Sequence, residues 1–342
     1  MKKRTKKIFI IAEAGVNHNG SLDIARRMVR AAAAAGADAI KFQTFRAESM
    51  VSRLAAKAAY QKKNAPIRQS QFEMLKNLEL DEAAHQELFD LCRKNKIAFL
   101  SSPFDLESIE LLERLGLKTY KIPSGEITNL PYLARIGALS KKVILSTGMS
   151  VLSEIENALK VLVGAGTRKC DITVLHCVSE YPLTAGKANL KAMLAIKNAF
   201  GVNVGYSDHT VGIEIPIAAA ALGASVVEKH FTLNRNMRGP DHCLSATPAQ
   251  LKRMVLAIRN VESGLGNGIK RPTQAEQKIK QVVRKSIIAA TDITKGTKIT
   301  AAMLDIKRPG TGIAPVFFNR VAGKTARRAI KQDSVIKFAD LR

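Results

Sequence analysis

Short apolar runs alternate with helical patterns along the first 265 residues. The apolar runs end in polar or glycine residues and span 7–13, 37–43, 97–103, 118–124, 142–148, 171–177, 202–208 and 224–230. Helical spacing is found between and after them, over 21–35, 70–94, 105–115, 129–139, 151–164, 189–199, 212–222 and 248–263. The runs are too apolar for strands with one face in water, so we expect strands covered on both faces. Eight strand–helix units of this kind predict an α/β fold, the (β/α)8 TIM barrel.

A doubly wound open sheet is the alternative to the barrel. Such a sheet usually has fewer strands, and its first strand often leads into a glycine-rich turn. No Gly-x-Gly-x-x-Gly motif follows the first apolar run here, so the barrel is favoured. Ser21 and Ser153 are candidate caps for two of the predicted helices.

The repeating pattern ends at a glycine-rich stretch, 264–268. We interpret 1–265 as the barrel domain and the polar residues 266–283 as a linker. From 284 to 342, short apolar runs and turns predict a small β-rich domain. Within the barrel domain the loop 44–69 is too long for a plain connection, and we expect a lid or a binding element there.

The composition is that of an ordinary globular protein, with 46% hydrophobic and 24% charged residues. No apolar run approaches the roughly 18–20 residues of a membrane span. The N-terminus starts like a signal peptide, but its apolar run covers only Ile8–Ala12 before Glu13 interrupts it. We therefore expect a cytoplasmic protein without a membrane partner.

The charge is strongly positive, with 54 basic and 29 acidic residues and a formal net charge of +25. A field of this sign makes nucleic acid a partner to consider. Against it, aromatic residues make up only 5% of the chain, and the basic residues are spread along its whole length. A basic, nucleic-acid-associated protein without turnover remains the alternative from another functional class.

Polar residues stand at the end of every predicted strand, which is where TIM barrels carry their chemistry. Lys41 and Lys121 come from strands two positions apart in the ring and could face one anionic group. Hydroxyl groups are expected at the same level, from Ser102, Ser124, Ser146, Ser179 and Ser207. Lysines with hydroxyls suit a phosphate and a carboxylate, and the alternative for each lysine is a salt bridge to a neighbouring acid.

Two histidines give the sharper signal. His209 and His230 are one strand–helix unit apart, which places them on adjacent strand ends, close enough to share a divalent metal. Two imidazoles leave positions open for water and substrate, as a Lewis-acid site requires. Mn²⁺ is the favoured metal because no thiolate set lies nearby. Glu13 could be a third ligand or an acid–base group, and Asp241 is similarly placed.

Taken together, these segments resemble the sialic acid synthase family, which includes synthases of N-acetylneuraminic, legionaminic and pseudaminic acid. The matching sequences are IAEAGVNHNGSLDIA (11–25), KFQTF (41–45), SSPFD (101–105), KIPSGE (121–126), ILSTGMS (144–150), LHCVSEYP (175–182), GYSDHTVG (205–212), EKHFTL (228–233) and GPDH (239–242). KRPGTGI (307–313) matches in the C-terminal domain, which resembles the antifreeze-like SAF domain.

The resemblance implies a metal-dependent condensation of phosphoenolpyruvate with an N-acetylmannosamine-type sugar. The product would be a nine-carbon sialic acid, N-acetylneuraminate or legionaminate, and phosphate would be released. Within the family, the alternative is a legionaminate or pseudaminate synthase that uses a 2,4-diacetamido-6-deoxy hexose. A further alternative is a related synthase of seven- or eight-carbon keto acids, which acts on a phosphorylated sugar.

The resemblance also implies residue roles. His209 and His230 would hold the metal, usually Mn²⁺, with Mg²⁺ or Co²⁺ as alternatives. Phosphoenolpyruvate would be bound by Lys41, Ser102, Lys121, Ser124, Ser146, Ser179 and Ser207. Catalytic roles would belong to Glu13, Glu126 and Asp241, and sugar contacts to Gln43, Tyr181, Asp241 and Arg308. Arg308 matches an arginine that reaches the neighbouring subunit's site, which implies a domain-swapped homodimer.

Overall fold

The structure is a computed structural model that describes residues 7–55 and 70–342. The chain divides into two compact units, Met1–Gly266 and Asn267–Arg342. The lid or binding element predicted over 44–69 falls partly on residues 56–69, which lie outside the described residues. No helix within 7–55 and 70–342 is long and apolar enough to cross a membrane.

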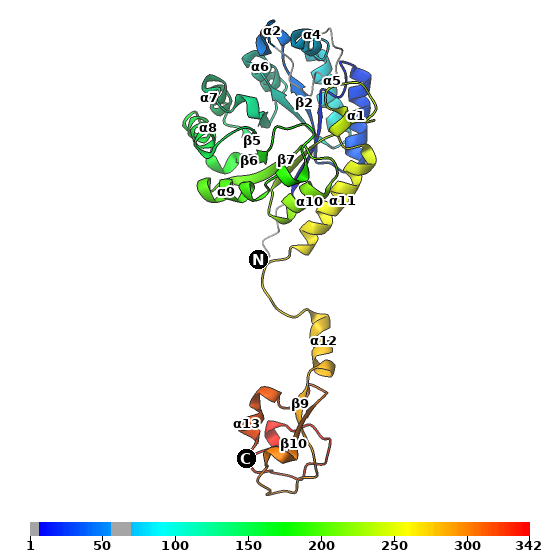
Figure 1. Cartoon of the computed structure of the whole chain (residues 1–342), viewed down its shortest axis with the longest axis vertical. Coiled ribbons are helices and arrows are strands. Elements are labelled where there is room, and N and C mark those ends of the chain that lie inside the picture. Colours follow the sequence, from blue (N-terminus) through cyan, green and yellow to red (C-terminus); the bar gives the residue numbers. More distant parts are fainter. Residues whose placement is uncertain (1–6, 56–69) are drawn as a thin grey trace. The chain divides into compact units, whose positions relative to one another are not determined.

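The first unit contains a parallel eight-stranded sheet with helices packed around it (Figure 1). The strand order is β3-β2-β1-β8-β7-β6-β5-β4, and the end strands β3 and β4 pack against each other, which closes the ring. The strands are β1 (Phe9–Gly15), β2 (Ala39–Thr44), β3 (Ala98–Pro103), β4 (Thr119–Ile122), β5 (Lys142–Ser146), β6 (Ile172–Cys177), β7 (Asn203–Asp208) and β8 (Val226–His230). The predicted TIM barrel is confirmed.

Apart from the short helices α2 (Ala47–Met50) and α4 (Gln71–Lys76), which belong to a separate apolar cluster, the helices of this unit cover the outside of the ring (Figure 1). The covering helices are α1 (Leu22–Ala34), α5 (Glu82–Lys94), α6 (Leu106–Arg114), α7 (Leu130–Ala138), α8 (Leu152–Gly164), α9 (Lys191–Phe200), α10 (Glu214–Ala221) and α11 (Pro248–Gly264). The main apolar core lies between them and the strands and includes Ile10, Ile40 and Val227 of the sheet. This burial on both faces explains why the strands read as apolar runs.

The barrel interior is built in layers. One residue from each of six strands contributes to a separate buried apolar cluster, formed by Ile11, Ala39, Leu100, Ile144, Leu175 and Val226. Because side chains alternate along a strand, the residue two positions later faces the same way. Those later positions hold Glu13, Lys41, Ser102, Ser146, Cys177 and Glu228. The apolar layer is thus the base on which a polar layer rests at the C-terminal end of the barrel.

Two helix boundaries differ from the sequence prediction. The helix expected over 70–94 is two helices, α4 and α5, because Asp81 caps α5 by accepting a hydrogen bond from the Ala84 backbone N. Ser21 caps α1 as predicted. Ser153 is not a cap: it lies inside α8, where the Glu154 side chain accepts a hydrogen bond from the Val151 backbone N instead.

The second unit begins with a helix, α12 (Gln274–Val283), inside the stretch interpreted as a linker. Reciprocal hydrogen bonds between Thr273 and Glu276 cap this helix. This pair of residues indicates a helix start, but the polar composition of the stretch led us to interpret it as a linker. The antiparallel strands β9 (Ser286–Ala289) and β10 (Leu304–Lys307) follow, with a separate apolar core. The short helix α13 (Phe318–Val321) packs in the same unit.

A buried ion pair braces the sheet beside one of the predicted metal-binding histidines. Lys229 of β8 donates to Asp208 of β7 over 2.5 Å, and their side chains are 1% and 0% exposed. Lys229 also donates to the Thr210 carbonyl oxygen over 2.7 Å. Asp208 in turn accepts from the backbone N and the hydroxyl of Thr210, over 3.1 and 2.9 Å. The residues on both sides of His209 are therefore fixed by charged hydrogen bonds.

We expect Lys229→Met to destabilise the protein by about 3–5 kcal/mol, because it leaves the Asp208 carboxylate buried without its cation. Urea unfolding followed by circular dichroism measures this loss. The double variant Lys229→Met/Asp208→Asn removes both charges and should recover part of it. A loss below about 1 kcal/mol in the single variant would contradict a bracing role.

Candidate functional site

A cavity of about 410 Å³ opens at the C-terminal ends of the strands. Thirteen of the fifteen predicted site residues line it: Glu13, Lys41, Gln43, Ser102, Lys121, Ser124, Ser146, Ser179, Tyr181, Ser207, His209, His230 and Asp241. Its lining also includes Glu228 and Cys177, which the sequence prediction did not assign to the site. Both could have been predicted, because they lie two positions after Val226 and Leu175, and side chains two positions apart on a strand face the same way.

Two lysines and two carboxylates form the buried charge centre of the cavity. Glu228 lies 3.2 Å from Lys41 and 3.5 Å from Lys121, measured between carboxylate oxygen and Nζ. Lys41 also lies 2.9 Å from a Glu13 carboxylate oxygen. The salt-bridge alternative considered for these lysines therefore holds in this structure. Each lysine also keeps a hydroxyl partner on the next strand, Ser102 for Lys41 and Ser146 for Lys121.

The two carboxylates differ in their proton affinity. Burial raises the pKa of Glu13 to about 7, although Lys41 opposes the rise. Burial would also raise the pKa of Glu228, but Lys121 and Lys41 outweigh it and lower that pKa to about 2. Glu228 is therefore the permanent anion of the centre, and Glu13 exchanges its proton near neutral pH. With Glu13 protonated, two lysines face one carboxylate, which leaves the centre positive and suited to an anionic ligand.

Serine hydroxyls and a backbone N–H converge beside Lys121. The Gly148 backbone N donates to Ser124 Oγ over 2.9 Å, and Ser124 Oγ lies 3.3 Å from Cys177 Sγ. A Cβ atom at Gly148 would come within 2.1 Å of Ser179 Oγ, so a side chain has no room here. Glycine at this position lets the backbone and the hydroxyls approach one another, a geometry that suits phosphate oxygens.

The histidines lie side by side on adjacent strand ends, with ring centroids 5.5 Å apart. Nδ1 of His209 lies 2.6 Å from the Val178 carbonyl oxygen, so Nδ1 carries the proton and Nε2 keeps its lone pair. Burial lowers the pKa of His209 and of His230, which keeps both imidazoles neutral. The Tyr181 ring lies 4.1 Å from the His209 ring, between centroids.

These two histidines fit a divalent cation by their chemistry. Nδ1 of His230 is buried without a hydrogen-bond partner and lies 3.9 Å from a carboxylate oxygen of Asp241. Burial raises the pKa of Asp241 to about 6. Nowhere in the described residues do three or more His, Cys, Asp or Glu side chains gather as a ready-made metal site. Two neutral imidazoles therefore form a partial ligand set, and water or substrate oxygens would complete it.

Asp241 is carried on a loop that the first strand end holds in place. Ser245 Oγ donates to the Asp241 carbonyl oxygen over 2.6 Å, and Asn17 Nδ2 donates to Ser245 Oγ over 2.9 Å. Asn17 also donates to the Phe231 carbonyl oxygen. Asn17 of the first motif thus orients the loop that follows β8.

Two predicted residues do not line this cavity. Glu126 is half-buried, and its carboxylate accepts a hydrogen bond from Asn129 Nδ2 over 2.7 Å, outside the cavity lining. Arg308 belongs to the unit Asn267–Arg342, where it is exposed. The barrel unit therefore brings together the predicted phosphoenolpyruvate and metal residues and most of the predicted sugar contacts.

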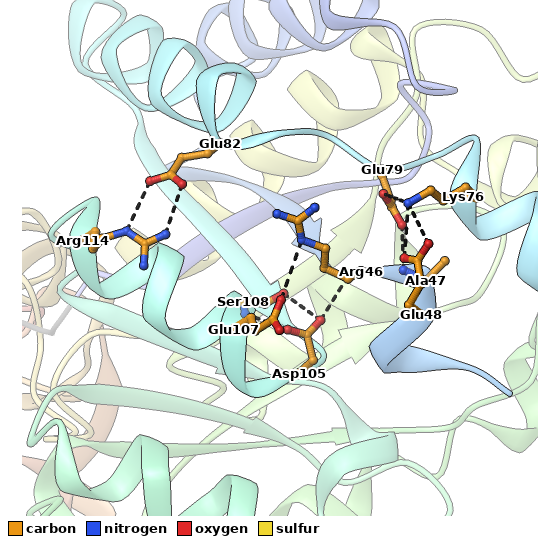
Figure 2. A network of polar contacts seen from close by, with 10 residues as sticks. All are labelled: Arg46, Ala47, Glu48, Lys76, Glu79, Glu82, Asp105, Glu107, Ser108 and Arg114. Carbon is orange, nitrogen blue, oxygen red and sulfur yellow. Dashed lines mark hydrogen bonds and ion pairs between the residues drawn. The ribbon is translucent and has the colours of Figure 1, made fainter.

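One side of the cavity is apolar and was not predicted from the sequence. Val16, Met50, Met74, Leu75, Leu78 and Phe104 line it, and we call them the apolar wall. In the sequence, apolar residues at helical spacing indicate residues that pack in an ordinary core. Figure 2 shows the polar network that ties α2 to α4: Lys76 pairs with Glu48 and Glu79, and Glu79 accepts from the Ala47 backbone N over 2.6 Å.

Comparison with known proteins agrees with the sequence motifs. The pattern of the NeuB family matches residues 28–270, and that of the SAF domain matches residues 284–342. An N,N'-diacetyllegionaminic acid synthase of Campylobacter jejuni is 52% identical over 97% of this chain and 99% of its own length. One from Legionella pneumophila is 47% identical over 92% and 89%.

A solved structure is similar as well. The N-acetylneuraminic acid synthetase of Leptospira borgpetersenii, in complex with citrate, has a TM-score of 0.70 and 34% identity and covers 80% of this chain and 90% of its own. The chain belongs to the NeuB family, the sialic acid synthases that its motifs resemble, and it carries a SAF domain at residues 284–342.

Proposed function

We propose that this enzyme condenses phosphoenolpyruvate with a 2,4-diacetamido-6-deoxy hexose to form N,N'-diacetyllegionaminic acid and phosphate. The two relatives at 52% and 47% identity carry that product in their names, which favours it over N-acetylneuraminate. The observation that carries the proposal is the cavity itself. It sets a lysine–hydroxyl cradle for an anion beside two neutral histidines at the mouth of one barrel.

The reaction joins carbon 3 of phosphoenolpyruvate to the aldehyde carbon of the open-chain sugar. Water adds to carbon 2, and the tetrahedral intermediate expels phosphate to leave the keto acid. Lys121, Ser124 and Ser146 would bind the anionic groups of phosphoenolpyruvate and orient carbon 3. His209 and His230 would hold a divalent cation, most simply Mn²⁺, whose chemistry when bound is that of a Lewis acid at a carbonyl oxygen.

Glu13 would supply the proton that the sugar oxygen needs. The aldehyde oxygen becomes a hydroxyl in the product, so one proton must be delivered to it as the new bond forms. Glu13 lines the cavity, and its raised pKa gives it a proton to donate near neutral pH. Lys41, 2.9 Å from the carboxylate, would stabilise the anion left behind.

The direct test is phosphate release from phosphoenolpyruvate with added Mn²⁺. Three sugars run in parallel: 2,4-diacetamido-6-deoxy-mannose, N-acetylmannosamine and N-acetylmannosamine 6-phosphate. We expect turnover of the first, abolished by EDTA and by His209→Ala, with Mn²⁺ binding lost in that variant. His176→Gln, a histidine outside the cavity lining, should keep both turnover and Mn²⁺ binding.

Other results of this assay would reject the proposal. Turnover of N-acetylmannosamine alone would make the enzyme an N-acetylneuraminate synthase, and turnover of the phosphosugar alone would make it a synthase of the phosphorylated class. No turnover by the folded protein with any sugar would favour the binding role that the +25 charge suggested.

We propose that Arg308 binds the N-acyl group of the sugar in the neighbouring subunit of a domain-swapped homodimer. The family motif around it and its exposed position before Pro309 support this role. Arg308→Ala should raise the apparent KM for the sugar at least about tenfold, as the loss of a charge-assisted hydrogen bond predicts. The KM for phosphoenolpyruvate should change little. Steady-state kinetics with each substrate varied in turn decides this, and equal rises in both constants would contradict it.

The titration of Glu13 should be visible in the stability of the metal-free protein. Its pKa is raised from 4.5 to about 7, so the folded state binds more protons than the unfolded state within this window. Stability from this group is therefore lost as the pH rises through it. Relative to Glu13→Gln, the wild type should lose on the order of 3 kcal/mol between pH 4.5 and pH 8.

Urea unfolding of both proteins at the two pH values measures this difference. Glu107→Gln, which changes an exposed carboxylate, serves as the matched control and should follow the wild type. If Glu13→Gln showed the same pH dependence as the wild type, Glu13 would not be the group that exchanges its proton near neutral pH.

A further inference from the structure

The cavity has two chemically different sides. Its floor is formed by strand ends and carries the charged groups, the hydroxyls and the histidines. Its apolar wall comes from the segments after β1, β2 and β3, and its members belong to one contiguous apolar cluster. A ligand that fills the cavity thus has one part among charges and another part against hydrocarbon.

Helical spacing gives the apolar wall a defined face. Gln71, Met74 and Leu75 line the cavity at positions i, i+3 and i+4, which share one side of α4, and Leu78 lines it from the turn that follows the helix. The three apolar residues are only 5%, 6% and 8% exposed, so they are packed and not free to turn away. Gln71, at the start of this face, places an amide at the edge of the apolar surface.

Hydrogen bonds outside the cavity lining hold the apolar wall in place. Ser70 and Glu73 cap α4 with reciprocal hydrogen bonds. In the network of Figure 2, the Arg46 backbone N also donates to Asp105 Oδ2 over 3.0 Å, which ties the start of α2 to the end of β3. The exposed ion pairs of Lys76 in this network each contribute little to stability. The position of α2 is fixed instead by the backbone hydrogen bonds that buried or half-buried carboxylates accept.

We propose that the apolar wall selects the sugar, by contacting the carbon 6 methyl and the 4-acetamido methyl of a 2,4-diacetamido-6-deoxy hexose. This inference rests on the proposed function. Where N-acetylmannosamine carries hydroxyls at these two positions, the apolar wall has no donor or acceptor to offer them, whereas two methyl groups bury well against it. The Gln71 amide can donate to the acetamido carbonyl oxygen and accept from the acetamido N–H.

The expected size of the selection follows from the kind of contact. A hydrophobic site distinguishes substrates that differ by one methylene by about 10–200-fold in kcat/KM. It rejects an added hydroxyl by a factor on the order of 100. Two such positions on one sugar therefore predict a preference well above tenfold, carried by the apolar wall and not by the groups that perform the chemistry.

The test compares kcat/KM for 2,4-diacetamido-6-deoxy-mannose with kcat/KM for N-acetylmannosamine in four proteins. These are the wild type, Met50→Gln, Met74→Gln and the control Met303→Gln. The first two substitutions add an amide to the apolar wall at nearly constant volume. Met50 is only half-buried, so its variant stays informative if Met74→Gln does not fold. Met303 is half-buried in the core of the SAF domain and is not one of the residues of the apolar wall.

We expect the ratio of the two constants to fall by about tenfold or more in each wall variant, with the KM for phosphoenolpyruvate unchanged. Met303→Gln should keep the wild-type ratio. If the folded wall variants lose activity equally on both sugars, the apolar wall is structural and the inference is wrong. A wild type that does not use the diacetamido sugar would instead reject the proposed function, and the inference with it.

Discussion

The site depends on the burial of opposite charges at the centre of the barrel. Glu228 stands between Lys41 and Lys121, and without it two ammonium groups would be buried side by side. Desolvation of charges is costly, and it is repaid here by close ion pairs and by hydroxyl partners on neighbouring strands. Because these groups come from separate strands, the charge centre is complete only in the closed ring.

The same arrangement assigns different tasks to two similar residues. Both glutamates are buried and both contact Lys41, yet the second lysine near Glu228 keeps it ionised while Glu13 takes up a proton near neutral pH. A permanent anion and an exchangeable proton thus lie within one cluster, as acid–base chemistry at neutral pH requires. The apolar wall lines the same cavity and offers these charged groups no competing hydrogen-bond partner.

Much of the barrel site could be predicted because strand ends follow directly from the apolar runs. Lys41 and His209 needed only a correct fold and the rule that chemistry lies at the C-terminal ends of strands. The strand period after Val226 could have placed Glu228 in the site, but it could not have predicted its role, because a single carboxylate at a strand end does not reveal its partners. Its importance appears only when two lysines from other strands are seen beside it.

The apolar wall was missed because Met74 and Leu75 have the spacing of ordinary core, and only the cavity distinguishes a lining residue from a packed one. Glu126 lies in a matching motif, but its side chain accepts a hydrogen bond from Asn129 and does not line the cavity, and the motif alone could not predict that placement.

The layered interior has a consequence for how such a site can change. Since apolar and polar residues alternate with period two, a shift of one residue in any strand would turn Ile11 or Val226 outward together with the glutamate two positions later. An insertion or deletion inside a strand would therefore disrupt the apolar layer and the polar site residues together. New activities on this scaffold must arise by replacing side chains in place or by altering the segments beyond the strand ends, where length is not tied to the register of the barrel.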